Sequence, residues 1–227
     1  MAFSWNFCCT FSFVKKLDLL FIEQQLKHRW DYKYVWKRKQ NDLWDAYTSY
    51  IYKTQNWEDL IPKMAKTIKE YKLDKHELFY YASNRWYNFW SAMAVEQMFT
   101  EIDGITPAIN NTDKEKDFFI HKKSFDHKTS IFPKGFGQDI NYSKNNKLEL
   151  ITWLYQNQSS QKRFHLKNRL FIIVHNSNGQ HWKLKAELSL IKNAIQNYMN
   201  SYHEDQLQKV IFAENKIALS DIIWVQK

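Results

Sequence analysis

Two aspartates and a lysine lie close together in the stretch 116–130, KDFFIHKKSFDHKTS, with a spacing that suits phosphate chemistry. We expect this stretch to form two short strands joined by a tight basic turn at about Lys122–Lys123. Side chains alternate along a strand, so Asp126 and Lys128 should share one face while His127 takes the other.

In a hairpin with a two-residue turn there, Asp117 is expected roughly opposite Lys128, and Asp126 opposite Phe119. Two carboxylates and an ammonium group would then converge. Carboxylate oxygens are the ligands that Mg²⁺ prefers, and a bound metal can activate water and stabilise charge on a phosphate. A lysine beside them could orient the water or neutralise developing charge. The alternative is a solvated charged face.

Other hydrolytic chemistries have no support in the sequence. There is no GxSxG segment for a serine nucleophile and no HExxH or clustered Cys and His for zinc. The only cysteines, Cys8 and Cys9, are adjacent and unlikely disulfide partners for each other. Reduced thiols favour a cytoplasmic location.

The formal net charge of +9 favours a polyanionic partner such as nucleic acid. The alternative is a basic surface without a dedicated partner. Residues 1–14 are apolar, but the segment is short and lacks a basic leader, so we interpret it as a loosely held tail rather than a signal peptide. No later segment has membrane-spanning length, and a membrane partner is not expected.

The N-terminal part, residues 1–83, is predicted to be a tail and a helical extension. Residues 17–54 are predicted to be helical, in two pieces, and they interleave aromatic with basic side chains. Those aromatics could mark a nucleic-acid surface, or they could be core residues among solvated lysines. Asn56 is a predicted cap for a helix reaching about Tyr71, and Asp74 for a short helix.

Residues 84–227 are predicted to form the core, and they begin with a buried helix over Asn84–Ile102 that is apolar almost all round. Between Arg85 and Glu101, Glu96 is the only charge, and it needs a cationic or metal partner, or an edge position. A short strand is expected at Ala108–Ile109. A capping box at Asn146–Glu149 predicts a helix to about Gln158.

The remaining elements follow from apolar patterns. NRLFIIVH, residues 168–175, predicts a strand covered on both faces. Asn178–Gly179 predicts a hairpin turn into the alternating segment 181–187. Leu188–Tyr202 predicts an amphipathic helix, and SDIIWV, residues 220–225, a final buried strand.

The ordered set resembles the PD-(D/E)xK nuclease superfamily, the restriction-endonuclease-like fold with an αβββαβ core. It comprises a buried helix with Glu96, a strand with Asp117, a strand with Asp126-x-Lys128, a helix and an apolar strand. The resemblance covers roughly residues 84–175 and implies an α/β (α+β) fold with a mixed central sheet flanked by helices. Lys116 stands where the motif often has proline, and His127 where an apolar residue is usual.

By this resemblance Asp117 and Asp126 are metal-binding acids, Lys128 is the catalytic lysine and Glu96 is an additional catalytic and metal-binding carboxylate, with Glu101 as its alternative. The resemblance implies Mg²⁺, with Mn²⁺ able to substitute, and hydrolysis of phosphodiester bonds in DNA, expected to be double-stranded, in restriction or defence. A homodimer is reasonable, because double-strand cutters often pair two sites. The predicted nucleic-acid contacts outside the motif are Lys134, Gln158, Gln161 and Arg163.

Two rival interpretations stay open. One is a non-catalytic nucleic-acid-binding or partner-binding protein that retains the nuclease fold. The other is a helical scaffold on an anionic membrane, which needs a basic amphipathic helix with a clean apolar face. Residues 31–54 meet that requirement only in part.

Overall fold

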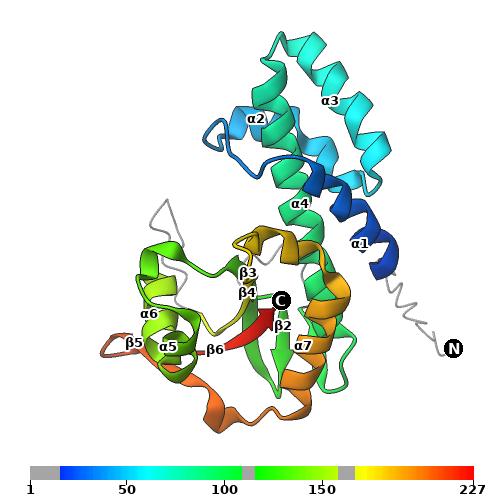
Figure 1. Ribbon diagram of the computed structural model, residues 1–227. Coiled ribbons are helices and arrows are strands. Elements are labelled where there is room, and N and C mark those ends of the chain that lie inside the picture. The colour runs from blue at the N-terminus through cyan, green and yellow to red at the C-terminus, as the bar shows by residue number, and fades with distance from the viewer. Residues whose placement is uncertain (1–15, 109–115, 158–166) are drawn as a thin grey trace, which may run out of the picture.

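The computed structural model describes residues 16–108, 116–157 and 167–227. The chain is mixed α/β, with one open six-stranded sheet and helices packed around it (Figure 1). The α-helices are α1 (Leu19–Lys27), α2 (Asp42–Tyr47), α3 (Trp57–Tyr71), α4 (Lys75–Thr100), α5 (Ile140–Asn145), α6 (Lys147–Asn157) and α7 (Leu188–Asn200). The strands are β1 (Ile105–Pro107), β2 (Phe118–Ile120), β3 (Lys123–Ile131), β4 (Arg169–His175), β5 (Gln208–Ala213) and β6 (Lys216–Gln226). Five short 3₁₀ helices are η1 (His28–Asp31), η2 (Ser49–Lys53), η3 (Lys134–Phe136), η4 (His181–Ala186) and η5 (Glu204–Gln206).

The strand order is β1-β2-β3-β4-β6-β5. β1, β2 and β3 form an antiparallel meander, β3, β4 and β6 are mutually parallel, and β5 is an antiparallel edge strand. From α4 to β4 the chain therefore runs helix, three strands, helices, strand. Figure 1 shows α7 on one side of the sheet and α5 and α6 on the other, with α1, α2 and α3 gathered around the far part of α4.

β4 is covered on both faces, as its apolar run predicts. Leu170, Ile172 and Val174 join the large core under α4 and α7, while Phe171 and Ile173 join a second core with α6. Alternate side chains of one strand thus hold two helical layers to the sheet.

α4 is one helix of 26 residues, so the short helix predicted after Asp74 is wrong. Asp74 does cap it, accepting a hydrogen bond from the Glu77 N–H at 2.8 Å, but the helix continues to Thr100. It passes without a break through residue 83, and its buried side chains lie on all sides. No local sequence signal ends the helix at residue 83. Side chains of both the N-terminal part and the core pack against α4, and the helix continues.

The capped helix α3 and the amphipathic helix α7 confirm their predictions, and the N-terminal helices form two α-helical pieces joined to 3₁₀ turns. Residues 181–186 were predicted to continue a hairpin, and this is wrong. They form η4, although Leu184 and Ala186 are still buried. The final strand exists but pairs with β5, which the sequence analysis did not predict.

The hairpin exists, but its predicted register is wrong by two residues, because the turn lies one residue earlier than predicted. The turn lies at His121–Lys122, where both residues have positive φ, 46° and 71°. This is the backbone of the tight hairpin turns usually made by Asn-Gly. Phe118 therefore pairs with Phe125, and both side chains are buried under α4. The predicted register leaves every side chain on the same face but would place Phe118 opposite His127, so pairing of the two buried aromatic rings favours the observed register.

Candidate active site at the start of β2 and β4

The corrected register places Asp117 opposite Asp126, not opposite Lys128. Asp117 immediately precedes β2, and its N–H donates to the Phe125 carbonyl at 2.9 Å. There the two strands separate, and the carboxylate of Asp117 accepts the next N–H of β3, from His127, at 2.8 Å. On the other side of β3, Asp126 is level with Arg169, the first residue of β4. Three strands therefore bring these side chains together.

His127 lies on the α4 face of β3, opposite to Asp126 and Lys128, as alternation predicts. Its ring stacks against Phe118 and packs against Phe99 of α4. Its Nδ1 lies 2.7 Å from Asp117 Oδ2. Burial disfavours ionisation of Asp117, but the hydrogen bonds and the charge of His127 outweigh it and lower the pKa of Asp117 to about 2. Burial likewise opposes the charged form of His127, and its bond to Asp117 nevertheless raises the His127 pKa.

Asp126 forms an ion pair with Arg169, whose Nε donates to Oδ2 at 2.6 Å and whose second nitrogen contacts the same oxygen. The guanidinium also lies over the rings of Tyr155 and Phe171, at 5.6 and 5.7 Å, which hold it in place. Burial, and then the charge of Asp117, raise the pKa of Asp126 despite the opposing charge of Arg169. Asp126 is therefore the more easily protonated of the two aspartates.

Lys128 follows Asp126 on the same face of β3. Burial and the positive charge of Arg169 lower its pKa, while the charge of Asp126 acts in the opposite direction. A second lysine, Lys185 of η4, is close enough for the Lys128 charge to affect it. Burial, and then that charge, lower the pKa of Lys185 to about 8.

The structure distinguishes the two helix carboxylates. Glu96 lies on the part of α4 that faces His127, and its pKa is raised by burial and then by the charge of Asp117. Glu101 is at the C-terminus of α4, where it pairs with Lys16 and Lys192. Of the two, Glu96 is the carboxylate that interacts with the candidate site.

The predicted nucleic-acid contacts are only partly described. Lys134 is exposed in η3, beyond the C-terminal end of β3, where its charge acts on His181. Gln158, Gln161 and Arg163 lie outside the described residues, as does the N-terminal tail.

The chemistry of the site suits a hard divalent cation in part. Asp117 and Asp126 supply adjacent carboxylates, and Mg²⁺ is commonly held by one or two carboxylates while it keeps several waters. Each carboxylate uses its Oδ2 in its bonds to His127 or Arg169. Among the described residues, no three His, Cys, Asp or Glu side chains gather closely enough to hold a metal ion. The two aspartates thus fit a divalent ion whose remaining ligands are water or phosphate oxygens.

Sequence reasoning missed Arg169 and the role of His127. Arg169 opens an otherwise apolar strand, and a charge at that position signals a partner on the neighbouring strand. His127 was noted only as an unusual residue between Asp126 and Lys128. Its bond to Asp117 depends on the register of the hairpin, which the sequence analysis placed wrongly.

Comparisons with protein-family models, with curated proteins and with solved structures found no match. None of the described helices combines the length and the apolar character needed to cross a membrane. The chemistry of the site is therefore argued from its own residues.

Proposed function

We propose that this chain is a Mg²⁺-dependent nuclease of the PD-(D/E)xK type, hydrolysing phosphodiester bonds in DNA. The observation that carries the proposal is the meeting of Asp117 and Asp126 where β2 and β3 separate, with Lys128 two residues along the same face. The order α4, β1, β2, β3, α6, β4 supports a restriction-endonuclease-like core, because it is the αβββαβ order expected for that fold. Double-stranded DNA, a cytoplasmic location and a homodimer belong to the proposal.

In this proposal Asp117 and Asp126 would hold the metal, and Glu96 would act from α4 through its electrostatic interaction with Asp117 and His127. The metal, when bound, would lower the pKa of a water and stabilise the leaving oxygen. Lys128 orients that water or neutralises charge on the phosphate. His127 keeps Asp117 ionised and in position, and Arg169 orients Asp126. Mn²⁺ is expected to substitute for Mg²⁺.

The test is cleavage of plasmid, linear duplex and single-stranded substrates, with and without Mg²⁺. Asp126→Ala and Lys128→Ala should abolish cleavage while nucleic-acid binding is retained. Lys209→Ala, an exposed change on the edge strand β5, is the matched control and should cleave normally. Unchanged cleavage by both site variants in Mg²⁺ would refute the assignment.

A second candidate is a non-catalytic nucleic-acid-binding protein with the same fold. It is favoured by the ion pairs of the site, since both aspartates already have a cationic partner, His127 or Arg169. Calorimetric titration with Mg²⁺ and Mn²⁺ separates the two. The nuclease should bind metal and lose that binding on Asp126→Ala, whereas a binding-only protein should show no metal site there.

A further inference from the structure

The segment 31–39, DYKYVWKRK, crosses the start of α4 with neither helix nor strand after Asp31, bends at Lys37 and Arg38, and is held there by buried side chains. The guanidinium of Arg29, itself fully buried, donates to the carbonyl oxygens of Tyr32 at 3.0 Å and of Lys33 at 2.8 Å. It also donates to Asn84 of α4 at 2.7 Å, and the Asn84 amide donates to the Val35 carbonyl at 2.8 Å. The backbone of the segment is therefore ordered before any partner binds, which lowers the entropic cost of binding.

This ordered segment presents both aromatic and positively charged side chains to solvent. Tyr32 is 40% exposed and Trp36 39% exposed. Lys33, Lys37 and Lys39 are also exposed, and none of them has a carboxylate partner among the described residues. Trp44 nearby is buried, whereas Tyr32 and Trp36 keep part of their rings in solvent, as Tyr52 and Tyr71 of the same N-terminal part also do.

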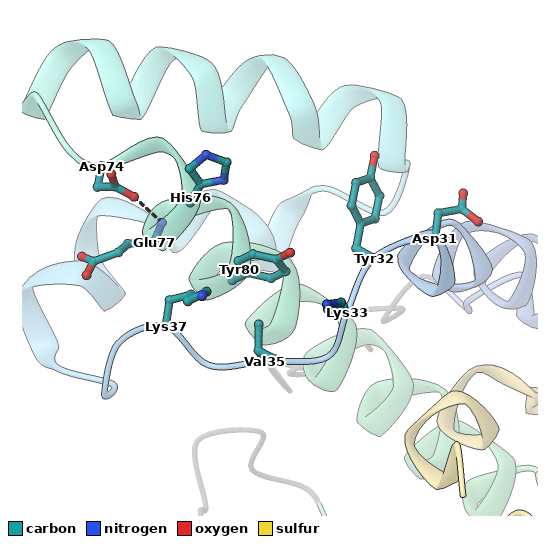
Figure 2. Close-up of a pocket in the computed structure, with 9 residues that line it drawn as sticks. All are labelled: Asp31, Tyr32, Lys33, Val35, Lys37, Asp74, His76, Glu77 and Tyr80. Atoms are coloured by element: carbon teal, nitrogen blue, oxygen red, sulfur yellow. Dashed lines mark hydrogen bonds between the residues drawn. The ribbon is translucent and has the colours of Figure 1, made fainter. Parts of the chain in front are cut away.

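A cavity of about 860 Å³ lies between this segment and the first turns of α4 (Figure 2). Figure 2 shows Lys33 and Lys37 along the segment, the Tyr80 ring between it and α4, and Asp74 and Glu77 at the start of the helix. Two of the three acids that line the cavity already have partners. Asp74 caps α4, and Glu77 pairs with Arg38 at 2.7 Å. The lining of the cavity therefore carries charges of both signs, and the excess of positive charge comes from the segment itself, where Lys33, Lys37 and Lys39 outnumber Asp31.

A polar path connects this segment to the candidate active site. The Tyr34 hydroxyl exchanges hydrogen bonds with Asn88 of α4, at 3.0 and 3.2 Å. The same Asn88 oxygen accepts from Lys185 Nζ at 3.1 Å. Lys185 in turn lies within electrostatic reach of Lys128, and η4 packs against β3. Cationic and polar groups thus follow one another from the segment to Lys128.

We infer that the segment 31–39 is a binding site for single-stranded nucleic acid, connected through the part-buried Asn88–Lys185 hydrogen bond to the strand that carries Lys128. Exposed rings stack on the faces of unpaired bases, and lysines spaced along such a segment contact successive phosphates. A duplex hides its base faces in the helix stack, so a single strand is the partner that uses both features. The inference rests on the proposed function for its substrate, and it replaces the fully paired duplex of that proposal by DNA that has an unpaired stretch.

The experiment measures binding of a fluorescently labelled oligothymidylate by anisotropy, in EDTA so that no metal-dependent cleavage occurs. Trp36→Ala should weaken binding about tenfold, as expected when one stacked base is lost. Lys33→Ala/Lys37→Ala should reduce the slope of log K against log salt by about 1.4, because each phosphate contact on a single strand contributes about 0.7.

Matched controls are Tyr71→Ala, which removes a ring that is 42% exposed on α3, and Lys66→Ala/Lys69→Ala, which removes two exposed charges from the same helix. Both controls should bind like the wild type.

Equal affinity of all variants for the oligonucleotide would overturn the inference. So would equal or tighter binding of the matching duplex, or loss of binding to anionic vesicles that parallels the loss for DNA. The inference and the proposed function fail separately. If the segment variants lose binding but the wild type never cleaves in Mg²⁺, only the nuclease proposal fails. If the wild type cleaves and the segment variants bind normally, only the inference fails.

Discussion

Replacing Arg169 by methionine removes the cation that pairs with Asp126 but keeps much of the side-chain volume. The two side chains are 10% and 23% exposed. Breaking a fully buried pair by deleting one partner costs about 3–5 kcal/mol, because an uncompensated charge stays inside. The partial exposure of Asp126 allows some solvation, so we expect Arg169→Met to lower the free energy of unfolding by about 3 kcal/mol at pH 8.

The same substitution has a predictable pH dependence. The pKa of Asp126 is already raised by burial and by Asp117, and Arg169 opposes that rise. Without Arg169 the folded-state pKa rises further above the unfolded value. A raised acid pKa gives stability that is present below the unfolded pKa and is lost as pH rises through the folded pKa. The difference from the wild type should therefore be smallest near pH 4 and largest at pH 8, in urea unfolding followed by circular dichroism.

The control is Lys123→Met, which breaks a pair with Glu204 in which both side chains are 42% exposed. Such pairs contribute about 0–1 kcal/mol, so this variant should unfold like the wild type. Adding Asp126→Asn to Arg169→Met should recover stability at pH 8, because the unpaired charge is gone. A wild-type value for Arg169→Met at pH 8, or a loss that does not change with pH, would refute the assigned ion pair.

Three further substitutions test the site and the core. Asp117→Asn should lower the free energy of unfolding by about 2 kcal/mol at pH 7, because the pKa of Asp117 falls from 3.8 to about 2 on folding. In urea unfolding this difference from the wild type should shrink as pH drops from about 4 towards 2. A difference that stays constant with pH would contradict the bond to His127. Glu96→Gln should raise stability at pH 8 but not at pH 4, since burial and the Asp117 charge disfavour the ionised acid; thermal melts at both pH values measure this, and equal melting shifts would argue against it. Trp86→Ala should lower the free energy of unfolding by about 3–5 kcal/mol, because the ring is fully buried and its Nε1 donates to the Thr54 carbonyl. A loss of less than about 1 kcal/mol in urea unfolding would contradict this packing.

Elements whose local signals agree with their packing could be predicted from the sequence. In α3 an Asn56 cap precedes an amphipathic pattern, and the helix forms over the expected residues. β4 is an apolar run of strand length, and it forms a strand covered on both faces. In both cases propensity, period and burial favour the same structure, so no tertiary contact has to override the local preference.

Elements decided by distant contacts were not predictable. The hairpin turns at His121–Lys122 without glycine or asparagine, because burying Phe118 against Phe125 outweighs the strain of two positive φ angles. Residues 181–186 alternate like a strand but have no place beside β4, the strand that they follow, since β6 and β3 already flank it. Distant contacts also determine the geometry of the candidate site. Asp117, Asp126 and Lys128 could be predicted, but the pairing of Asp126 with Arg169 depends on the register of two strands whose paired residues are 43 positions apart.

The paired charges of the site determine how metal and nucleic acid would bind together. Arg169 and His127 already neutralise the two aspartates, and Lys128 adds a further cation, so a divalent ion entering alone gains little electrostatic attraction. A phosphate group in the site offers Arg169 and Lys128 an anion and restores the net negative charge that a metal needs. Because coupling between two ligands is reciprocal, each should then tighten the binding of the other. Calorimetric titration of Mg²⁺ into the wild type should therefore give a higher affinity with a non-cleavable phosphorothioate oligonucleotide bound than without it. In Arg169→Met the affinities for Mg²⁺ with and without the oligonucleotide should be more similar, because the guanidinium that competes with the metal for Asp126 is absent. Equal affinity for Mg²⁺ in both states of the wild type would show that the Arg169 ion pair does not compete with the metal for Asp126.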